Sequence, residues 1–225
     1  MALDPPTMLT LSIALAAAAA LYLAIEWRNV REPSLLFWSA GFSTIAVGST
    51  LVLLRMARLA ARDPLTALYN RRALEVRAPR LLEEVCSARP GALLLIDIDN
   101  FKLVNDLHGH IAGDRLLVML SEMIRALLPG GALAARLGGD EFVILLGDVT
   151  DERVVALGSA LREQFHRAAA QAFATPEAVT LSIGASLFDR PPASLAALIE
   201  QGDAALYESK RGGRDSIRLV AGGEA

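Results

Sequence analysis

Cysteine and histidine are scarce in this chain of 225 residues, which contains one cysteine, Cys86, and three histidines. One cysteine cannot form an intramolecular disulfide, which agrees with a reducing compartment. No cysteine or third histidine lies near His108 and His110 in the sequence, so no zinc ligand set is expected, and we interpret His110 as structural. An excess of basic over acidic residues is also lacking, because the formal net charge is −3. The charge therefore gives no indication of nucleic acid as a partner.

Charged residues are absent from two long stretches near the N-terminus, residues 8–25 and 35–54. As a helix, each stretch is about long enough to cross a hydrocarbon core of roughly 30 Å. No basic region precedes the first stretch and the second follows at once, so we expect two transmembrane helices rather than a signal peptide or a buried soluble hairpin. Small residues spaced for close helix contact in lipid are Ser12, Ala16 and Ala20 in the first stretch and Ala40, Thr44 and Gly48 in the second.

Arginines give two conflicting indications of membrane orientation. Arg55, Arg58 and Arg62 follow the second stretch directly, which favours a cytoplasmic location for everything after it. Arg28 and Arg31 lie in the connection between the two stretches and favour the opposite orientation. Charge alone therefore does not decide the orientation.

Beyond Arg62 the composition becomes that of a soluble domain. Asp63-Pro64 indicates a turn, and Thr66 or Asn70 is expected to cap a helix that begins near Arg71 and runs to about residue 85. Further helices are expected over about 113–128, 151–173 and 194–210, strands over 92–99, 178–188 and 216–220, a hairpin over 132–146 and a turn at 101–105. With no internal repeat, this order predicts an α+β domain in which helices pack on a sheet.

Four acids lie where these expected strands end. Asp97 and Asp99 close an apolar strand, while Asp140 and Glu141 follow Gly138-Gly139 in the hairpin turn. Two glycines before an acid also make a favourable hairpin turn, and acids at strand ends are often only solvated. If the two strands are sheet neighbours, however, Asp97 and Asp140 converge, and a hard cation such as Mg²⁺ would offset the cost of burying them. Glycines without side chains would then let the backbone approach a ligand closely.

Complementary polar groups lie elsewhere in the domain. Lys102 offers a cation for phosphate, and Asn105 and Asp114 offer an amide and a carboxylate suited to the edge of guanine, unless they only make an Asx turn and a helix cap. Lys210 and Arg214 flank a Gly-Gly pair, where they can hold phosphates or interact with a helix C-terminus. The residues expected to be turn glycines in either case are Gly109 and Gly113.

The chain resembles the diguanylate cyclase (GGDEF) family in four ordered blocks: DPLTALYNRRAL, LLLIDIDNFKLVND..GH..GD, RLGGDEF and ALYESKRGGR. The resemblance covers about residues 63–220. It implies a palm-like fold similar to adenylyl cyclase catalytic domains, with a central, mostly antiparallel sheet flanked by helices. It also implies condensation of two GTP into cyclic di-GMP by a homodimer. The expected domains are a membrane anchor at 1–62 and the cyclase domain at 63–222.

The resemblance assigns roles to individual residues. Asp97, the Ile98 carbonyl and Asp140 match the family's ligands for Mg²⁺ (or Mn²⁺), and Asp140 could also assist deprotonation of the attacking hydroxyl. Asn105 and Asp114 match its guanine-reading pair. The remaining matched positions line the triphosphate (Phe101, Lys102, Lys210 and Arg214) or form the catalytic signature that positions the nucleotide (Gly138, Gly139 and Glu141, with Asp140).

The chain departs from the family pattern at two places. Ala67 stands where the family usually has glycine, and residues 129–132, PGGA, stand where its product-inhibition site needs Arg-x-x-Asp. We therefore expect no feedback inhibition through that site. The segment between the second apolar stretch and Asp63 is also short, so the membrane pair is expected to be an anchor and dimeriser, or the remnant of a larger sensor.

The resemblance also bears on location and on alternatives. GTP is cytoplasmic, which places both termini and the cyclase domain on the cytoplasmic side of a bacterial inner membrane. One alternative function is a non-catalytic GTP-binding or dimerisation module on the same fold, although the signature acids that such a module would lose are present. Another alternative is a related cyclase that acts on a different nucleotide. The match of Asn105 and Asp114 to the family's guanine-reading pair argues against it.

Overall fold

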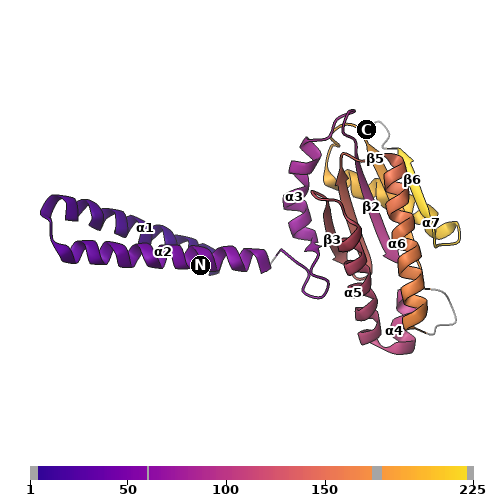
Figure 1. Ribbon diagram of the computed structural model, residues 1–225, viewed down its shortest axis with the longest axis horizontal. Helices are drawn as coiled ribbons and strands as arrows, with labels where there is room; N and C mark the ends of the chain where they lie inside the picture. Colours follow the sequence, from indigo (N-terminus) through magenta and orange to yellow (C-terminus); the bar gives the residue numbers. More distant parts are fainter. Residues whose placement is uncertain (1–4, 60, 174–178, 222–225) are drawn as a thin grey trace. The chain divides into compact units, whose positions relative to one another are not determined.

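The computed structural model describes residues 5–59, 61–173 and 179–221 (Figure 1). The chain divides into two compact units, residues 1–60 and residues 61–225. Among the described residues, the N-terminal unit consists of two helices, and the C-terminal unit contains the strands.

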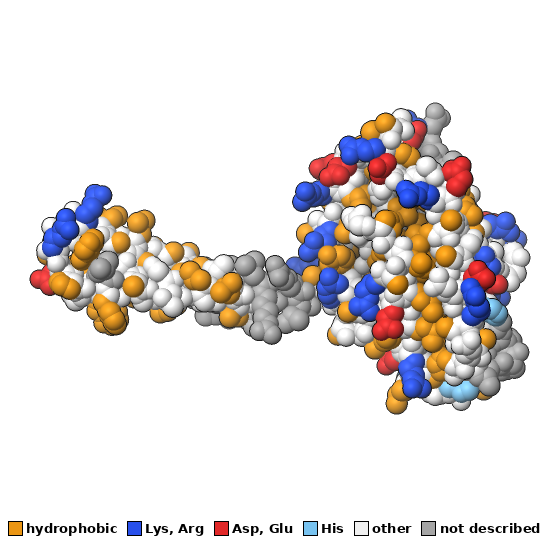
Figure 2. All heavy atoms as spheres, viewed as in Figure 1, with side chains coloured by type: hydrophobic (Ala, Val, Ile, Leu, Met, Phe, Trp, Pro, Cys, Tyr) orange, Lys and Arg blue, Asp and Glu red, His pale blue; other side chains and the backbone are white. Residues whose placement is uncertain are grey.

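The N-terminal unit is a pair of helices, α1 (Pro5–Val30) and α2 (Pro33–Leu59). Each contains a window that is long and apolar enough to cross a membrane by length and composition, Ile13–Val30 and Pro33–Val52. Large apolar side chains remain exposed around the pair, including Leu21 at 64% and Phe37 at 77%. Basic side chains gather at the end that carries the connection between the helices (Figure 2). Apolar exposure on this scale is unfavourable in water and favours contact with lipid or with another protein.

Small residues bring α1 and α2 together. On α1 they are residues of the expected row, whereas on α2 they are not. Ala16 and Ala20 are buried, and the buried Ser39 Oγ donates a hydrogen bond to Ala20 O at 2.9 Å. The contact face of α2 is therefore offset by one residue from the expected one. The row expected on α2 is exposed: Ala40, Thr44 and Gly48. The side chain of Ser12 lies outside the described part of the chain.

The C-terminal unit is built on a six-stranded sheet with the order β1-β3-β4-β2-β5-β6. Its strands are β1 (Tyr69–Asn70), β2 (Gly91–Ile98), β3 (Leu133–Gly138), β4 (Glu141–Gly147), β5 (Leu181–Phe188) and β6 (Ile217–Ala221). The four central strands pair antiparallel, whereas β1 and β6 pair parallel to their neighbours at the two edges. The sheet is thus mixed, with an antiparallel centre.

Helices cover both faces of this sheet (Figure 1). They are α3 (Arg71–Glu83) and α7 (Leu195–Arg211) on one face, and α4 (Phe101–His108), α5 (His110–Leu127) and α6 (Asp151–Ala172) on the other. Strand β2 is buried along its whole length, because alternate side chains enter opposite cores. Leu94 and Ile96 pack with α5 and α6, while Leu93 and Leu95 pack with α3 and α7. The polar end of β2 is therefore fixed at the centre of the domain.

Helix α7 lies very close to β5. A Cβ atom on Gly184 would be 2.2 Å from both Gly202 O and Leu206 N, so only glycine fits at this point of the strand. Backbone contact of this kind leaves little freedom for α7 to slide. It fixes the C-terminal end of α7, which carries Lys210.

The expected turn at residues 101–105 is wrong, because this segment begins helix α4. Val104 is fully buried and Phe101 is partly buried, so the segment packs on the core as a helical turn rather than running over the surface. Helix α5 begins at His110 instead of Gly113, and Gly113 is buried inside that helix. Gly109, with φ of +80°, does form the junction between the two helices as expected.

The turn that opens the C-terminal unit is stabilised by its own side chains. Asn70, not Thr66, caps α3, because its Oδ1 accepts a hydrogen bond from Ala73 N at 2.9 Å. The amide and the hydroxyl of Thr66 instead donate to Asp63 Oδ1 at 2.8 and 2.7 Å. Ala67, where the family usually has glycine, adopts a left-handed conformation with φ of +58°.

Candidate functional site

Strands β2 and β4 bring the acids of two separate sequence motifs together. The strands are antiparallel neighbours, and Asp97 lies directly opposite Glu141. Residues opposite each other in an antiparallel pair share one face of the sheet. Asp140 immediately precedes Glu141, at the turn between β3 and β4. Convergence of Asp97 and Asp140 was expected only if the two strands are sheet neighbours. The structure meets this condition.

Asp97 is a carboxylate that is costly to ionise. Its side chain is only 11% exposed. Burial raises the pKa of Asp97 to about 6, and the nearby charges of Asp140 and Asp99 raise it as well, against the lowering effect of Lys210. Lys210 Nζ lies 2.8 Å from Asp97 Oδ2. A position expected to bind phosphate thus meets a position expected to bind metal, although the two are far apart in the sequence.

This set of groups fits a hard divalent cation. The described residues contain no group of three or more His, Cys, Asp or Glu side chains arranged for a metal ion. Mg²⁺ is commonly held by one or two carboxylates together with substrate phosphates and water. Asp97, Asp140 and the carbonyl of Ile98, the last residue of β2, are the groups that would supply such a partial ligand set. A cation would also relieve the electrostatic cost of ionising Asp97.

The turn between β3 and β4, which carries the signature, is held in place by side chains outside the turn. Arg136 Nε and Nη2 donate hydrogen bonds to Gly139 O at 3.0 and 2.8 Å, and Arg136 Nη1 lies 3.2 Å from Asp63 Oδ1. Gly139 has φ of +52°, and the pairing register shifts between Arg136 and Gly138. The turn is therefore an irregular one that ties the signature to the start of the domain. Sequence reasoning assigned no role to Arg136, whose signal was its place as the single charged residue of β3.

The expected guanine-reading pair lies where α4 meets α5. A Cβ atom on Gly113 would be 2.0 Å from Asn105 Oδ1 and 3.1 Å from Phe101 Cζ, so both side chains pack against this glycine. Asn105 therefore lies beside the first turns of α5, next to the exposed Asp114. The ring of Phe101 is partly buried and packs against the core. Lys102 is exposed on α4.

Arg214 lies in the loop between α7 and β6, with its Nε 3.8 Å from Asp99 Oδ1. The Asp99 side chain is fully buried, whereas that of Arg214 is 56% exposed. Sequence reasoning noticed Asp99 among the acids but gave it no function. Its signal was the spacing of two from Asp97 at the end of an apolar strand, which puts the two carboxylates on one side of the sheet and close together.

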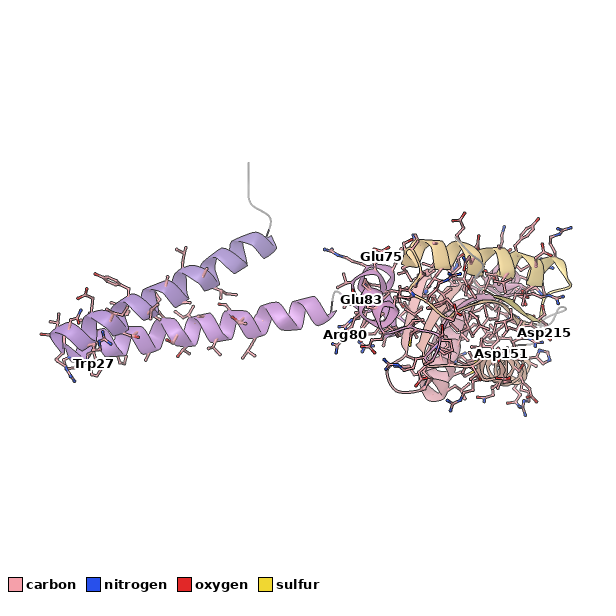
Figure 3. All side chains as sticks on the ribbon, turned by 90° about the horizontal axis from the view of Figure 1, so that it is seen from above. Trp27, Glu75, Arg80, Glu83, Asp151 and Asp215 are labelled. Atoms are coloured by element: carbon pink, nitrogen blue, oxygen red, sulfur yellow. The ribbon has the colours of Figure 1, made fainter. Side chains whose placement is uncertain are left out.

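Glu141, which lies opposite Asp97 in the β2–β4 pair, is also part of a concave surface. It lines an open pocket of about 930 Å³ between α3 and α7, together with Arg71. The pocket is rimmed by acids, including Glu75 and Glu83, which project from α3 (Figure 3). Its floor is apolar, with Leu95 of β2 among the lining residues. The signature thus faces both the acid pair at the strand ends and this pocket.

Residues 60–216 match the family model described as diguanylate cyclase, GGDEF domain. The chain is similar to diguanylate cyclase DgcP of Pseudomonas aeruginosa, with 38% identity over 165 residues, covering 72% of this chain and 24% of that protein. It is similar to the probable diguanylate cyclase DgcT of Escherichia coli, with 36% identity over 163 residues, covering 71% and 35%. The chain therefore spans about a quarter to a third of the length of these two relatives.

Among solved structures, the chain is similar to the coiled coil and GGDEF domain of DgcB from Caulobacter crescentus in complex with c-di-GMP. The TM-score is 0.70 at 28% sequence identity, and the match covers 80% of this chain and 96% of that chain.

Proposed function

Because the chain belongs to the GGDEF family of diguanylate cyclases, we propose that it condenses two GTP into cyclic di-GMP and releases pyrophosphate. The observation that carries this proposal is the meeting of Asp97, Asp140 and Lys210 at the ends of β2 and β4. Carboxylates for a divalent cation beside an ammonium group for phosphate are what phosphoryl transfer from a nucleotide requires. The named cyclases among the relatives, and the DgcB structure with c-di-GMP, support the choice of substrate and product.

The proposed metal ligands are Asp97, Asp140 and the Ile98 carbonyl, and the proposed ion is Mg²⁺ or Mn²⁺. When bound, such an ion neutralises charge on the triphosphate and favours ionisation of the attacking 3′-hydroxyl. Lys210 is close enough to Asp97 to neutralise the carboxylate before the nucleotide arrives and to turn to phosphate afterwards. Asp140 is proposed to assist removal of the proton from the 3′-hydroxyl.

The remaining residues are proposed to bind and orient the nucleotide. The Asp114 carboxylate accepts hydrogen bonds from guanine N1–H and N2–H, while the Asn105 amide pairs with its edge. Phe101 holds Asn105 and α5 in place by packing on Gly113. The residues proposed to line the triphosphate are Phe101, Lys102, Lys210 and Arg214, and those proposed to form the catalytic signature are Gly138, Gly139, Asp140 and Glu141.

Each cyclase domain binds one GTP in this proposal, so two chains must face each other for the 3′-hydroxyl of one nucleotide to attack the α-phosphorus of the other. The exposed apolar surface of α1 and α2 supports their role as a membrane anchor that also brings two chains together. We assign residues 1–62 to the anchor and residues 63–222 to the cyclase domain. The cyclase domain would lie in the bacterial cytoplasm, where GTP is found.

The test is incubation of the full chain, purified in detergent, with GTP and Mg²⁺, followed by chromatography for cyclic di-GMP. We expect product from the wild type and from Glu163→Gln, which removes an exposed carboxylate on α6, but not from Asp140→Asn. Parallel incubation with ATP tests the alternative hypothesis that the chain is a cyclase for another nucleotide. Binding of GTP without any product would support a non-catalytic module instead.

A further inference from the structure

The loop between α7 and β6 has a backbone that its own sequence does not favour. Three consecutive residues have positive φ angles: Gly213 at 111°, Arg214 at 63° and Asp215 at 41°. Arginine and aspartate carry a Cβ atom, for which this conformation is unfavourable, so contacts from outside the loop must maintain it. The loop also carries Arg214, one of the proposed phosphate-binding cations.

Asp99 supplies the contact from inside the domain. Its carboxylate accepts hydrogen bonds from Thr180 Oγ1 at 2.7 Å and Ser182 Oγ at 2.8 Å, both from the β5 side of the sheet. The same carboxylate accepts a hydrogen bond from Asp215 N at 3.2 Å, and Arg214 Nε lies 3.8 Å away. One fully buried side chain thus joins the end of β2, the start of β5 and two residues of the loop.

Arg162 of α6 holds the same loop from the solvent side. Its Nε and Nη2 contact Asp215 Oδ1 at 3.1 and 2.9 Å, and its Nη2 also donates to Asp215 O. Figure 3 marks Asp215 in the described part of the chain just after α7. Ser209 of α7 adds a hydrogen bond to Ser216 O at 2.9 Å. The left-handed turn is therefore fixed on both sides.

From these contacts we infer that Asp99 is a positioning residue for nucleotide binding, which holds the 212–216 loop so that Arg214 is aimed at the triphosphate. The inference rests on the proposed function. A buried carboxylate needs compensating donors, and Asp99 obtains them from Thr180, Ser182 and the backbone amide of Asp215, while the Arg214 cation lies 3.8 Å away. Because Arg214 remains 56% exposed, its guanidinium can meet a phosphate while its Nε stays near Asp99. At the end of β2, Asp97 thus pairs with Lys210, and Asp99, just beyond the strand, pairs with Arg214.

The test is binding of a GTP analogue with a methylene group between the α- and β-phosphorus atoms, compared with binding of GMP, by the full chain in detergent. Asp99→Asn is close in shape but loses the charge. We expect it to weaken the analogue about tenfold, as loss of a charge-assisted hydrogen bond does, and to leave GMP unchanged. In an Arg214→Ala background, Asp99→Asn should cause no further loss.

The outcomes separate the inference from the proposed function. If the wild type does not bind the analogue, the proposed function fails and the inference fails with it. If the wild type binds but Asp99→Asn weakens the analogue and GMP equally, or its effect multiplies with that of Arg214→Ala, the inference alone is overturned. An Asp99→Asn chain that binds the analogue as tightly as the wild type overturns it too.

A second variant covers the case in which Asp99→Asn does not fold. Arg162→Ala removes the outer contact to Asp215 and should weaken the analogue about threefold, with no effect in the Arg214→Ala background. Arg167→Ala is the matched control, because Arg167 lies on the same helix and pairs only with the exposed Glu163 in the described ion pairs. Equal binding by the Arg162 and Arg167 variants would then overturn the inference.

Discussion

Asp97→Asn should stabilise the metal-free chain while abolishing catalysis. Burial raises the pKa of Asp97 to about 6 from the ordinary 3.8, so ionisation of this side chain opposes folding. Below pH 3.8 the carboxyl group is protonated in both states and costs nothing. The cost grows as the pH rises from 3.8 to about 6 and is constant above that, so the wild type loses stability across this window.

The difference between the two pKa values corresponds to about 3 kcal/mol of unfolding free energy at pH 8. Asparagine cannot ionise, and its amide oxygen still accepts a hydrogen bond from Lys210. For a unit of this size, the gain should raise the melting temperature by about 5–10 °C. The relevant assay is thermal unfolding of the full chain in detergent with a chelator, at pH 8 and at pH 4.5.

We expect the advantage of Asp97→Asn at pH 8 to shrink strongly at pH 4.5, where most of the wild-type carboxylate is protonated. Glu163→Gln is the control, since its exposed carboxylate should change stability little at either pH. A lower melting temperature for Asp97→Asn at both pH values would refute the reasoning. It would mean that the ion pair with Lys210 outweighs the cost of burial.

Four further changes have definite expected outcomes. Ala67→Gly should raise the unfolding free energy by about 1 kcal/mol in denaturant titrations, because Ala67 has φ of +58°. Gly113→Ala should raise the KM for GTP at least about tenfold, since its Cβ would displace Asn105; an unchanged KM would argue against guanine binding at this junction. Arg136→Ala should lower kcat about tenfold by releasing Gly139 O, measured by product formation beside Arg167→Ala. Added cyclic di-GMP should leave the maximal rate unchanged, because the turn at 129–132 has no charged side chain; inhibition at saturating GTP would contradict this.

The arrangement of the sheet could be predicted from local patterns where those patterns were strong. The apolar run that ends at Asp97 is a strand buried on both faces, and the hairpin around Gly138-Gly139 forms the expected β3–β4 pair. Helix α4 was missed because polar residues hide its short apolar face, of which Val104 is the buried member. Gly113 was placed in a turn because glycine disfavours helix interiors, whereas here close packing against Asn105 requires it.

The contacts of the site were less predictable, because they join residues that are distant in the sequence. Proximity of Asp97 to Lys210, and of Asp99 to Arg214, depends on how α7 packs on β5, which local patterns do not specify. The anchoring of Gly139 by Arg136 likewise depends on the irregular register of the hairpin. The roles of individual residues in nucleotide binding came from the resemblance to the family, and they stay predictions.

The most direct test of the central claim is the stoichiometry of the reaction catalysed by the full chain in detergent with GTP and Mg²⁺. Cyclic di-GMP, pyrophosphate and remaining GTP are quantified together over time. The account predicts two GTP consumed and two pyrophosphates released for each cyclic di-GMP formed. Release of inorganic phosphate with accumulation of GDP, or no turnover at any enzyme concentration, would contradict it.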